Sequence, residues 1–181
     1  MATVPLQNSE DTLVSVREYL RTSYSPDREY VDGRIVERNL GEKGHSILQM
    51  YLGFLFMLNR TAWGIEVYPE LRTKLRTKLY RIPDVLVVRS GVKFEDVLDQ
   101  PPLIAIEILS PDDRWNDVLE KVEEYKSFQV ENIWIFDPKR QIVWLTDGGT
   151  LRKATDGVLT VPETPIRVVL SEAFAELDRA L

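Results

Sequence analysis

Cysteine is missing from this 181-residue chain, and histidine occurs once, at position 45. The lack of cysteine excludes disulfides, thiolate catalysis and zinc or iron–sulfur sites built on cysteine. A single histidine also makes histidine-rich zinc chemistry a poor expectation, so a bound metal would be held by oxygen ligands. Oxygen ligands suit Mg²⁺ or Mn²⁺, and these are the cofactors that we expect if the chain binds a metal.

Long apolar runs and an excess of positive charge are also missing. No apolar run approaches the roughly 18 residues of a membrane span, so we expect no membrane association. The first residues combine neither a basic start nor a long apolar segment, so we expect no signal peptide and a cytoplasmic location. The net charge of −6 argues against a protein that coats nucleic acid. It does not exclude a nuclease, because a local basic patch can still attract phosphate.

The hydrophobic pattern predicts an α/β fold, a mixed sheet flanked by helices, in a single domain over residues 1–181. Residues 1–11 are expected to form a flexible tail. Helical periodicity predicts helices over Thr12–Arg21, His45–Asn59 and Asn116–Phe128, and a last short helix through Phe174 and Leu177.

Strand patterns occupy the segments between these helices. Strands are predicted between Gly64 and Val88, at Leu103–Leu109 and near Ile166–Leu170. Hairpins are predicted at Asp32-Gly33 and around Asp137–Arg140.

Glu107 is the only charge in the apolar run Leu103–Leu109. A run of this kind, bounded by proline-containing segments, is typical of a strand buried on both faces. An ionised carboxylate there loses its hydration, so it needs a partner, a metal or a raised pKa. The alternative to a metal ligand is a buried ion pair with an arginine or a lysine.

A second acid, Asp84, stands at the mouth of the apolar strand Val85–Val88. Two acids that enter one β core suggest a divalent-cation site, completed by waters and a substrate phosphate. Such a cation neutralises phosphate charge and makes hydroxide available near neutral pH. Taken alone, Asp84 is equally well explained as a strand-start residue that bonds nearby backbone amides.

Lys121 falls within the apolar stripe of the helix predicted over Asn116–Phe128, so it should point toward the sheet. A lysine there could position an attacking water or stabilise the charge of a reacting phosphate. It could also extend its amine into solvent. Lys126 falls within the same arc, so helical geometry does not choose between the two lysines.

Two weaker features accompany these residues. His45, near the start of its helix, could contact substrate or a structural carboxylate. A basic stripe is expected to share one strand face, where it could track a phosphodiester backbone or only keep an exposed edge soluble. The stripe consists of Arg72, Lys74, Arg76 and Lys78.

Pro83-Asp84, Glu107 in an apolar strand and a lysine on the following helix resemble the PD-(D/E)XK nuclease superfamily with a migrated lysine. More narrowly, the chain resembles the bacterial Uma-type family of restriction-endonuclease-like proteins. The matching segments follow one another in the expected order over most of the chain. They are Glu29–Gly33, His45, Arg81–Val88, Glu107–Pro111, Asp117–Tyr125 and Trp134–Pro138.

The resemblance implies a restriction-endonuclease-like fold and a metal-dependent phosphodiesterase site. By this resemblance, Asp84 and Glu107 would be the metal ligands, together with the backbone carbonyl of Ile108. Lys121 stands where the displaced catalytic lysine of such proteins sits. The departure is Leu109, which occupies the usual position of that lysine, so activity requires Lys121 to substitute for it.

Glu29 matches the acid that the N-terminal region contributes in the family, and the resemblance places it in the catalytic site. From its own surroundings in the sequence, Glu29 is better explained as a solvated strand residue. The resemblance also makes a homodimer a fair expectation, because two DNA strands need two sites. The hairpin tryptophans Trp134 and Trp144 would then pack in the core or at the subunit interface.

Three functions follow as hypotheses. The first is a Mg²⁺- or Mn²⁺-dependent endonuclease whose partner is DNA. The second is an inactive nuclease fold that binds nucleic acid or protein and keeps its acids as an ion-pair network with Lys121. The third is a small-molecule phosphodiesterase that uses the same metal centre.

Overall fold

The computed structural model describes residues 13–39 and 41–180, and it confirms the predicted mixed α/β fold. The tail expected over residues 1–11 and the expected helix start at Thr12 lie outside the described residues. Helix α1 covers Val16–Arg21, later than the apolar spacing predicted. The reason is that Ser15 caps the helix, accepting a hydrogen bond of 3.2 Å from the Glu18 amide.

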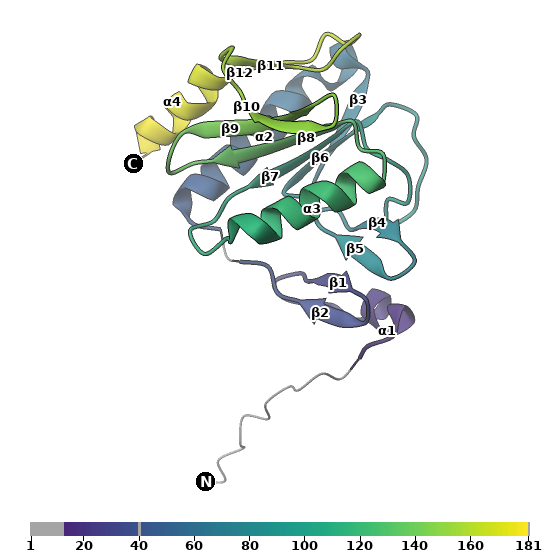
Figure 1. Ribbon diagram of the computed structural model, residues 1–181. Helices are drawn as coiled ribbons and strands as arrows, with labels where there is room; N and C mark the ends of the chain where they lie inside the picture. The colour runs from purple at the N-terminus through teal and green to yellow at the C-terminus, as the bar shows by residue number, and fades with distance from the viewer. Residues whose placement is uncertain (1–12, 40, 181) are drawn as a thin grey trace.

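A six-stranded sheet forms the centre of the molecule (Figure 1). Its strands, in spatial order, are β10 (Thr150–Lys153), β9 (Ile142–Asp147), β8 (Asn132–Asp137), β7 (Ile104–Ile108), β6 (Val85–Arg89) and β3 (Ile65–Pro69). Strands β7 and β8 run parallel, and the other neighbouring pairs run antiparallel. A parallel pair needs a long crossover connection, and here that crossover contains helix α3 (Trp115–Ser127).

Helices cover both faces of this sheet, α2 (Lys43–Trp63) and α4 (Leu170–Ala180) on one face and α3 on the other (Figure 1). The alternation along β7 shows the division, because Ile106 packs with the α2 side and Ala105 with the α3 side. Glu107 has the parity of Ala105 and therefore points toward α3. The predicted helices are thus confirmed, and α2 runs on until Gly64 ends it in the left-handed conformation, with φ 64°.

A second sheet of four antiparallel strands lies beside the first. Its order is β2 (Arg34–Val36), β1 (Glu29–Val31), β5 (Leu79–Arg81) and β4 (Thr73–Arg76). The predicted hairpin at Asp32-Gly33 is confirmed, and its φ values of 48° and 96° are those of a primed turn. The short segment Ile82–Asp84 joins β5 to β6 and so links the two sheets.

The basic stripe does not lie on one strand face, so this prediction is wrong. Strand β4 ends at Arg76, the next two residues form a turn that includes Lys78, and the chain returns as β5. The physical reason is packing, because folding back allows both Leu75 and Leu79 to enter the apolar cluster beneath α3.

The C-terminal part adds a small two-stranded sheet of β11 (Val158–Thr160) and β12 (Arg167–Val169). The strand predicted near residues 166–170 is therefore confirmed, whereas β10 and β11 were not predicted. Over the described part of the chain, no helix is both long and apolar enough to cross a membrane.

Candidate active site

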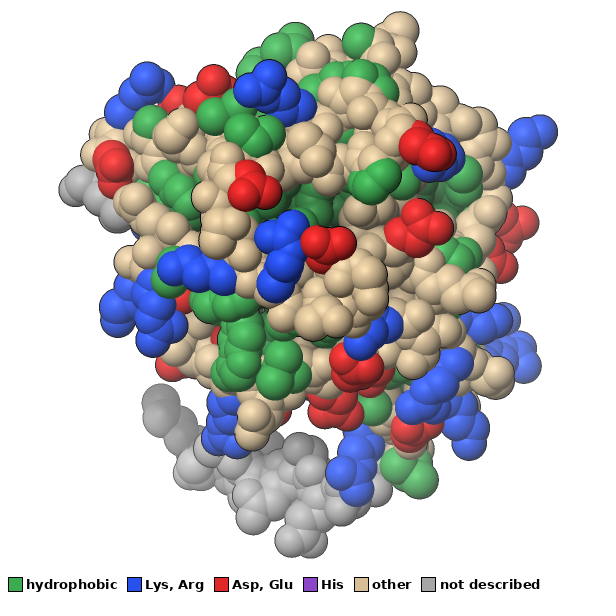
Figure 2. Space-filling view, turned by 45° about the horizontal axis from the view of Figure 1, so that its top comes forward, with side chains coloured by type: hydrophobic (Ala, Val, Ile, Leu, Met, Phe, Trp, Pro, Cys, Tyr) green, Lys and Arg blue, Asp and Glu red, His purple; other side chains and the backbone are tan. Residues whose placement is uncertain are grey.

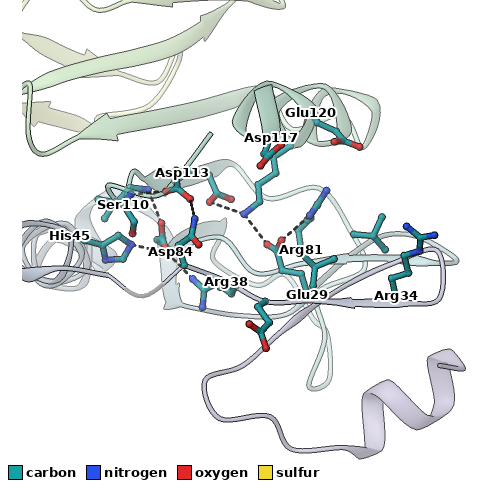
Figure 3. A pocket seen from close by; sticks show the side chains of 17 residues that line it. Glu29, Arg34, Arg38, His45, Arg81, Asp84, Ser110, Asp113, Asp117 and Glu120 are labelled. Atoms are coloured by element: carbon teal, nitrogen blue, oxygen red, sulfur yellow. Dashed lines mark hydrogen bonds and ion pairs between the residues drawn. The ribbon is translucent and has the colours of Figure 1, made fainter. Parts of the chain in front are cut away.

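A cavity of about 330 Å³ lies where the two sheets meet the N-terminal half of α3. Its wall receives side chains from β1, the loop after β2, the first turn of α2, the facing ends of β6 and β7, and α3 (Figure 3). They include Glu29, Arg38, His45, Arg81, Asp84, Glu107, Ile108 and Lys121. The residues predicted for catalysis and metal binding therefore lie around one cavity.

Asp84 and Glu107 come from neighbouring strands that meet at this cavity. Val85 pairs with Ile106 in the antiparallel β6–β7 ladder, and Asp84 and Glu107 are the residues next to this pair. Both acids line the cavity. The Ile108 amide donates to Asp84 Oδ2 at 2.7 Å and so fixes the Asp84 carboxylate against β7.

Glu107 is buried, and its surroundings make its negative charge costly. Burial and the nearby acids Asp84 and Glu29 raise the pKa of Glu107 to about 7. Lys121, with Nζ 3.5 Å from Glu107 Oε2, and a hydrogen bond from the Tyr125 hydroxyl act in the opposite direction. Of the three alternatives expected for this buried acid, a partner, a metal or a raised pKa, the structure gives Glu107 two partners, Lys121 and Tyr125, and burial raises its pKa.

Asp84 lies in the cavity next to Arg38 and His45 (Figure 3). Its Oδ1 accepts a hydrogen bond from Arg38 Nη2 at 2.7 Å and lies 3.3 Å from His45 Nε2. Burial acts to raise the pKa of Asp84, but His45, Arg38 and the Ile108 amide outweigh it and lower the pKa. For His45 the directions are reversed. Burial acts to lower the pKa of the imidazole, but the hydrogen bond to Asp84 outweighs burial, so the pKa of His45 is raised. His45 thus contacts a carboxylate, one of the two roles predicted for it.

Lys121, and not Lys126, reaches the cavity. The Lys121 side chain is 21% exposed, and its Nζ lies 3.1 Å from Glu29 Oε1. Lys126 instead pairs with Glu123 on the outer surface of α3, at 2.7 Å. Burial acts to lower the pKa of Lys121, but the two cavity glutamates raise it, so the side chain is an ammonium ion.

Glu29 is 1% exposed, so its interpretation as a solvated strand residue is wrong. Besides Lys121, it accepts hydrogen bonds from Arg81 Nη1 at 2.8 Å and from the Ile82 amide at 3.2 Å. Arg81 also donates to both carboxyl oxygens of Glu124 on α3, at 2.6 and 2.9 Å. Burial acts to raise the pKa of Glu29, but Lys121 and Arg81 lower it overall, so Glu29 is ionised.

Comparison with family models matches residues 16–173 to Uma2, described as "Putative restriction endonuclease". The chain belongs to the Uma2 family. A comparison with curated proteins finds no significant match.

Among solved structures, this Uma2 chain is similar to a "putative nuclease belonging to DUF820" from Anabaena variabilis ATCC 29413. The two are 20% identical with a TM-score of 0.77, and the alignment covers 91% of this chain and 99% of that one. At this identity the similarity shows the fold alone. A cryo-electron microscopy structure of a DrdV–DNA complex matches at 17% identity and a TM-score of 0.41, over 72% of this chain and 10% of that one. A TM-score this low supports no conclusion.

The basic residues predicted to bind substrate do not line the cavity of this Uma2 protein. Arg72 donates to both carboxyl oxygens of Asp27, and Arg76 donates to those of Asp32 at 2.6 and 2.7 Å. Lys74 is half-buried on β4. Both arginines are therefore neutralised within the chain, and a contact of these three residues with substrate stays a prediction.

Three residues of the Uma2 site were not predicted: Arg38, Arg81 and Tyr125. Helical periodicity already placed Tyr125 on the inward face of this helix next to Lys121, but it indicated no role for Tyr125 in the site. Arg81 lies three residues before Asp84, next to an apolar strand, and this position was only a weak indication that Arg81 belongs to the site. Arg38 stands in a loop between β2 and α2, and nothing in its local sequence marks it.

The cavity lining includes Asp84, Glu107 and Ile108, and carboxylate and backbone carbonyl oxygens are the kind of donors that a divalent cation takes. Burial is the largest cause of the raised pKa of Glu107, and a positive charge next to Glu107 would act to lower that pKa. Among the residues that the structure describes, no cluster of three or more acidic or imidazole side chains is arranged to hold a metal. A bound cation would therefore keep several waters, as Mg²⁺ commonly does.

Proposed function

We propose that this Uma2 protein is a Mg²⁺- or Mn²⁺-dependent DNA endonuclease, a single restriction-endonuclease-like domain that hydrolyses phosphodiester bonds in the cavity. The observation that supports this most is the meeting of two acids and one amine. Asp84, Glu107 and Lys121 line the same cavity, and the Lys121 amine lies 3.5 Å from the Glu107 carboxylate. Such a combination suits the hydrolysis of an anionic ester.

Each group has a separate task in this proposal. Asp84, Glu107 and the Ile108 carbonyl would hold the cation, which supplies charge neutralisation and an acidic water when bound. Lys121 keeps a positive charge at the cavity wall, where it would stabilise the phosphate's developing charge or orient the attacking water. Glu29, 3.1 Å from the Lys121 amine, holds that amine in place.

The same contacts favour a second candidate function, an inactive nuclease fold that binds nucleic acid or protein. Arg38 already covers Asp84 at 2.7 Å, and Lys121 already pairs with both cavity glutamates. In this case the acids persist as a buried ion-pair network with no metal.

DNA is the proposed partner. Acidic and basic side chains are interspersed over the face shown in Figure 2, which carries no broad basic area. With a net charge of −6 as well, DNA would be bound by local contacts at the cavity rather than by the field of the whole molecule.

A homodimer is also proposed, because cleavage of both strands needs two sites. Trp134 is 1% exposed within the core, and Trp144 packs against Trp115 with ring centroids 4.7 Å apart. The hairpin tryptophans therefore have partners inside the chain, and light scattering would measure the oligomeric state directly. A cytoplasmic location is proposed from the absence of cysteine.

Plasmid nicking tests the proposed function. Wild type with Mn²⁺ should nick supercoiled plasmid, and chelation of the metal, Glu107→Gln or Asp84→Asn should each abolish nicking. Mn²⁺ should raise the melting temperature of wild type but not of Asp84→Asn. A metal-induced shift without cleavage of any DNA form would contradict the nuclease, and the absence of any metal effect would favour the inactive module.

A further inference from the structure

Arg38 occupies the oxygen of Asp84 that faces the cavity. Its Nη2 lies 2.7 Å from Asp84 Oδ1, and its Nη1 lies 3.1 Å from Glu70 Oε1. The side chains of Arg38 and Asp84 are 13% and 6% exposed. Because salt screens a buried pair poorly, this contact persists until another charge replaces one of the two partners.

The remaining positions around the Asp84 carboxylate are also in use. Its Oδ2 accepts the Ile108 amide at 2.7 Å, and His45 Nε2 lies 3.3 Å from Oδ1. A divalent cation bound at Oδ1 would place two positive charges directly beside the Arg38 guanidinium. Like charges at contact distance in a shielded site repel strongly. A cation and Arg38 therefore compete for Asp84.

Arg38 has a second partner, Glu70, that would hold it after it leaves Asp84. It stands in the loop after β2, outside any helix or strand. Glu70, whose side chain is 50% exposed, would keep one nitrogen of the guanidinium anchored near the solvent side. The planar guanidinium suits the paired oxygens of a phosphate better than an ammonium does. Arg38 also lines the cavity in which that phosphate would lie.

We propose that Arg38 couples substrate binding to metal binding. Without substrate it covers Asp84 and weakens the affinity of the site for a divalent cation. A phosphodiester group in the cavity draws the guanidinium away, so phosphate and cation bind cooperatively. Such coupling is reciprocal, and each ligand strengthens the other by the same factor. This inference rests on the proposed metal-dependent function.

Calorimetric titration with Mn²⁺ tests the coupling without relying on activity. We expect Arg38→Gln to bind Mn²⁺ about tenfold more tightly than wild type, a factor within the usual range for coupled sites. A short phosphorothioate-linked oligodeoxynucleotide should tighten Mn²⁺ binding to wild type by a similar factor. The same oligonucleotide should leave the Mn²⁺ affinity of Arg38→Gln unchanged.

The matched control is Arg152→Gln, because Arg152 pairs with Asp147 at 2.8 Å on the β9–β10 hairpin and does not line the cavity. It should titrate as wild type does. Arg38→Lys serves if Arg38→Gln fails to fold, since an ammonium cannot span Asp84 and Glu70 as the guanidinium does. It should bind Mn²⁺ more tightly than wild type.

Mn²⁺ affinity that is equal to or weaker than that of wild type in the Arg38 variants overturns the coupling. Should that outcome occur while wild type binds Mn²⁺ and Asp84→Asn does not, the coupling is refuted but the metal site remains. If neither wild type nor Arg38→Gln binds Mn²⁺, with or without the oligonucleotide, the proposed metal-dependent function fails and the coupling fails with it.

Discussion

The amine of Lys121 lies 3.1 Å from Glu29 Oε1, so the crossover helix of the main sheet is joined to the smaller sheet inside the cavity. Arg81 makes a second connection between the same elements, from Glu29 at 2.8 Å to Glu124 at 2.6 Å. Lys121 and Glu124 lie almost one turn apart on α3, so the two connections close a ring. This ring fixes the position of the Lys121 amine in the cavity.

Lys121→Met should reduce plasmid nicking at least about a hundredfold, the lower range for loss of a positioned catalytic group. It should also lower the free energy of unfolding by about 3 kcal/mol, because Glu29 and Glu107 lose a buried partner. Initial nicking rates and urea unfolding measure the two effects. Lys126→Met is the matched control, because the pair of Lys126 with Glu123 is at the surface. It should leave the nicking rate unchanged and lower the free energy of unfolding by less than about 1 kcal/mol. Equal effects of the two variants would refute the assignment.

Arg81→Gln should destabilise the chain strongly. The Arg81 side chain is 7% exposed and joins Glu29 to Glu124, so its removal leaves buried charge unpaired at a cost of about 3–5 kcal/mol. Arg76→Gln provides the comparison, because the Arg76–Asp32 pair is bidentate but 53% and 54% exposed. Its loss should cost no more than about 1 kcal/mol. Urea midpoints that differ little between the two variants would show that the ring is not a stabilising element.

The raised pKa of Glu107 predicts how stability depends on pH in the absence of metal. Between its ordinary value of 4.5 and its folded value of about 7, the folded chain keeps a proton that the unfolded chain has lost. The free energy of unfolding contributed by this group is therefore greatest at low pH and falls as pH rises through that window.

Glu107→Gln removes this pH dependence and leaves Glu29 and Asp84, the cavity acids whose pKa values are lowered, in place. The free energy of unfolding of Glu107→Gln minus that of wild type should increase by on the order of 3 kcal/mol between about pH 5 and about pH 8. Urea unfolding of both proteins at the two pH values, with a chelator present, measures the gain. No gain between the two pH values would mean that Glu107 is ionised throughout.

Tyr125→Phe should weaken metal binding near neutral pH. The Tyr125 hydroxyl donates to Glu107 and acts to lower the pKa of that acid, so its loss lets a proton compete better with a cation. The Mn²⁺-induced rise in melting temperature should be smaller than in wild type at about pH 7 and recover at about pH 8.5. Tyr68→Phe, in a cluster with Phe94 away from the cavity, should behave as wild type. A deficit that does not vary with pH would indicate a packing effect.

The two acids were noticed in the sequence because Glu107 stands within an apolar strand and Asp84 directly precedes one. Lys121 was predictable only as one of two lysines, since the choice between it and Lys126 depends on Glu29, a residue from the other sheet. Arg38 shows most clearly what the sequence could not predict, because its partner Asp84 is distant in the chain and no periodicity connects the two residues.

The β4–β5 hairpin was missed for a local reason. Its turn at Thr77 and Lys78 has neither glycine nor proline, and the alternation of leucines with basic residues continues through it. Burial of Leu75 and Leu79 beneath α3 decided the conformation, and that burial exists only in the assembled fold.

The parallel pairing of β7 with β8 also explains how the amine of Lys121 comes to lie beside Glu107. Because parallel neighbours cannot be joined by a tight turn, the chain must travel over the sheet between them, and α3 is that route. Its inward face brings Lys121 and Tyr125 to Glu107. The positive charge next to Glu107 therefore depends on the path of the chain between two strands rather than on one short sequence motif.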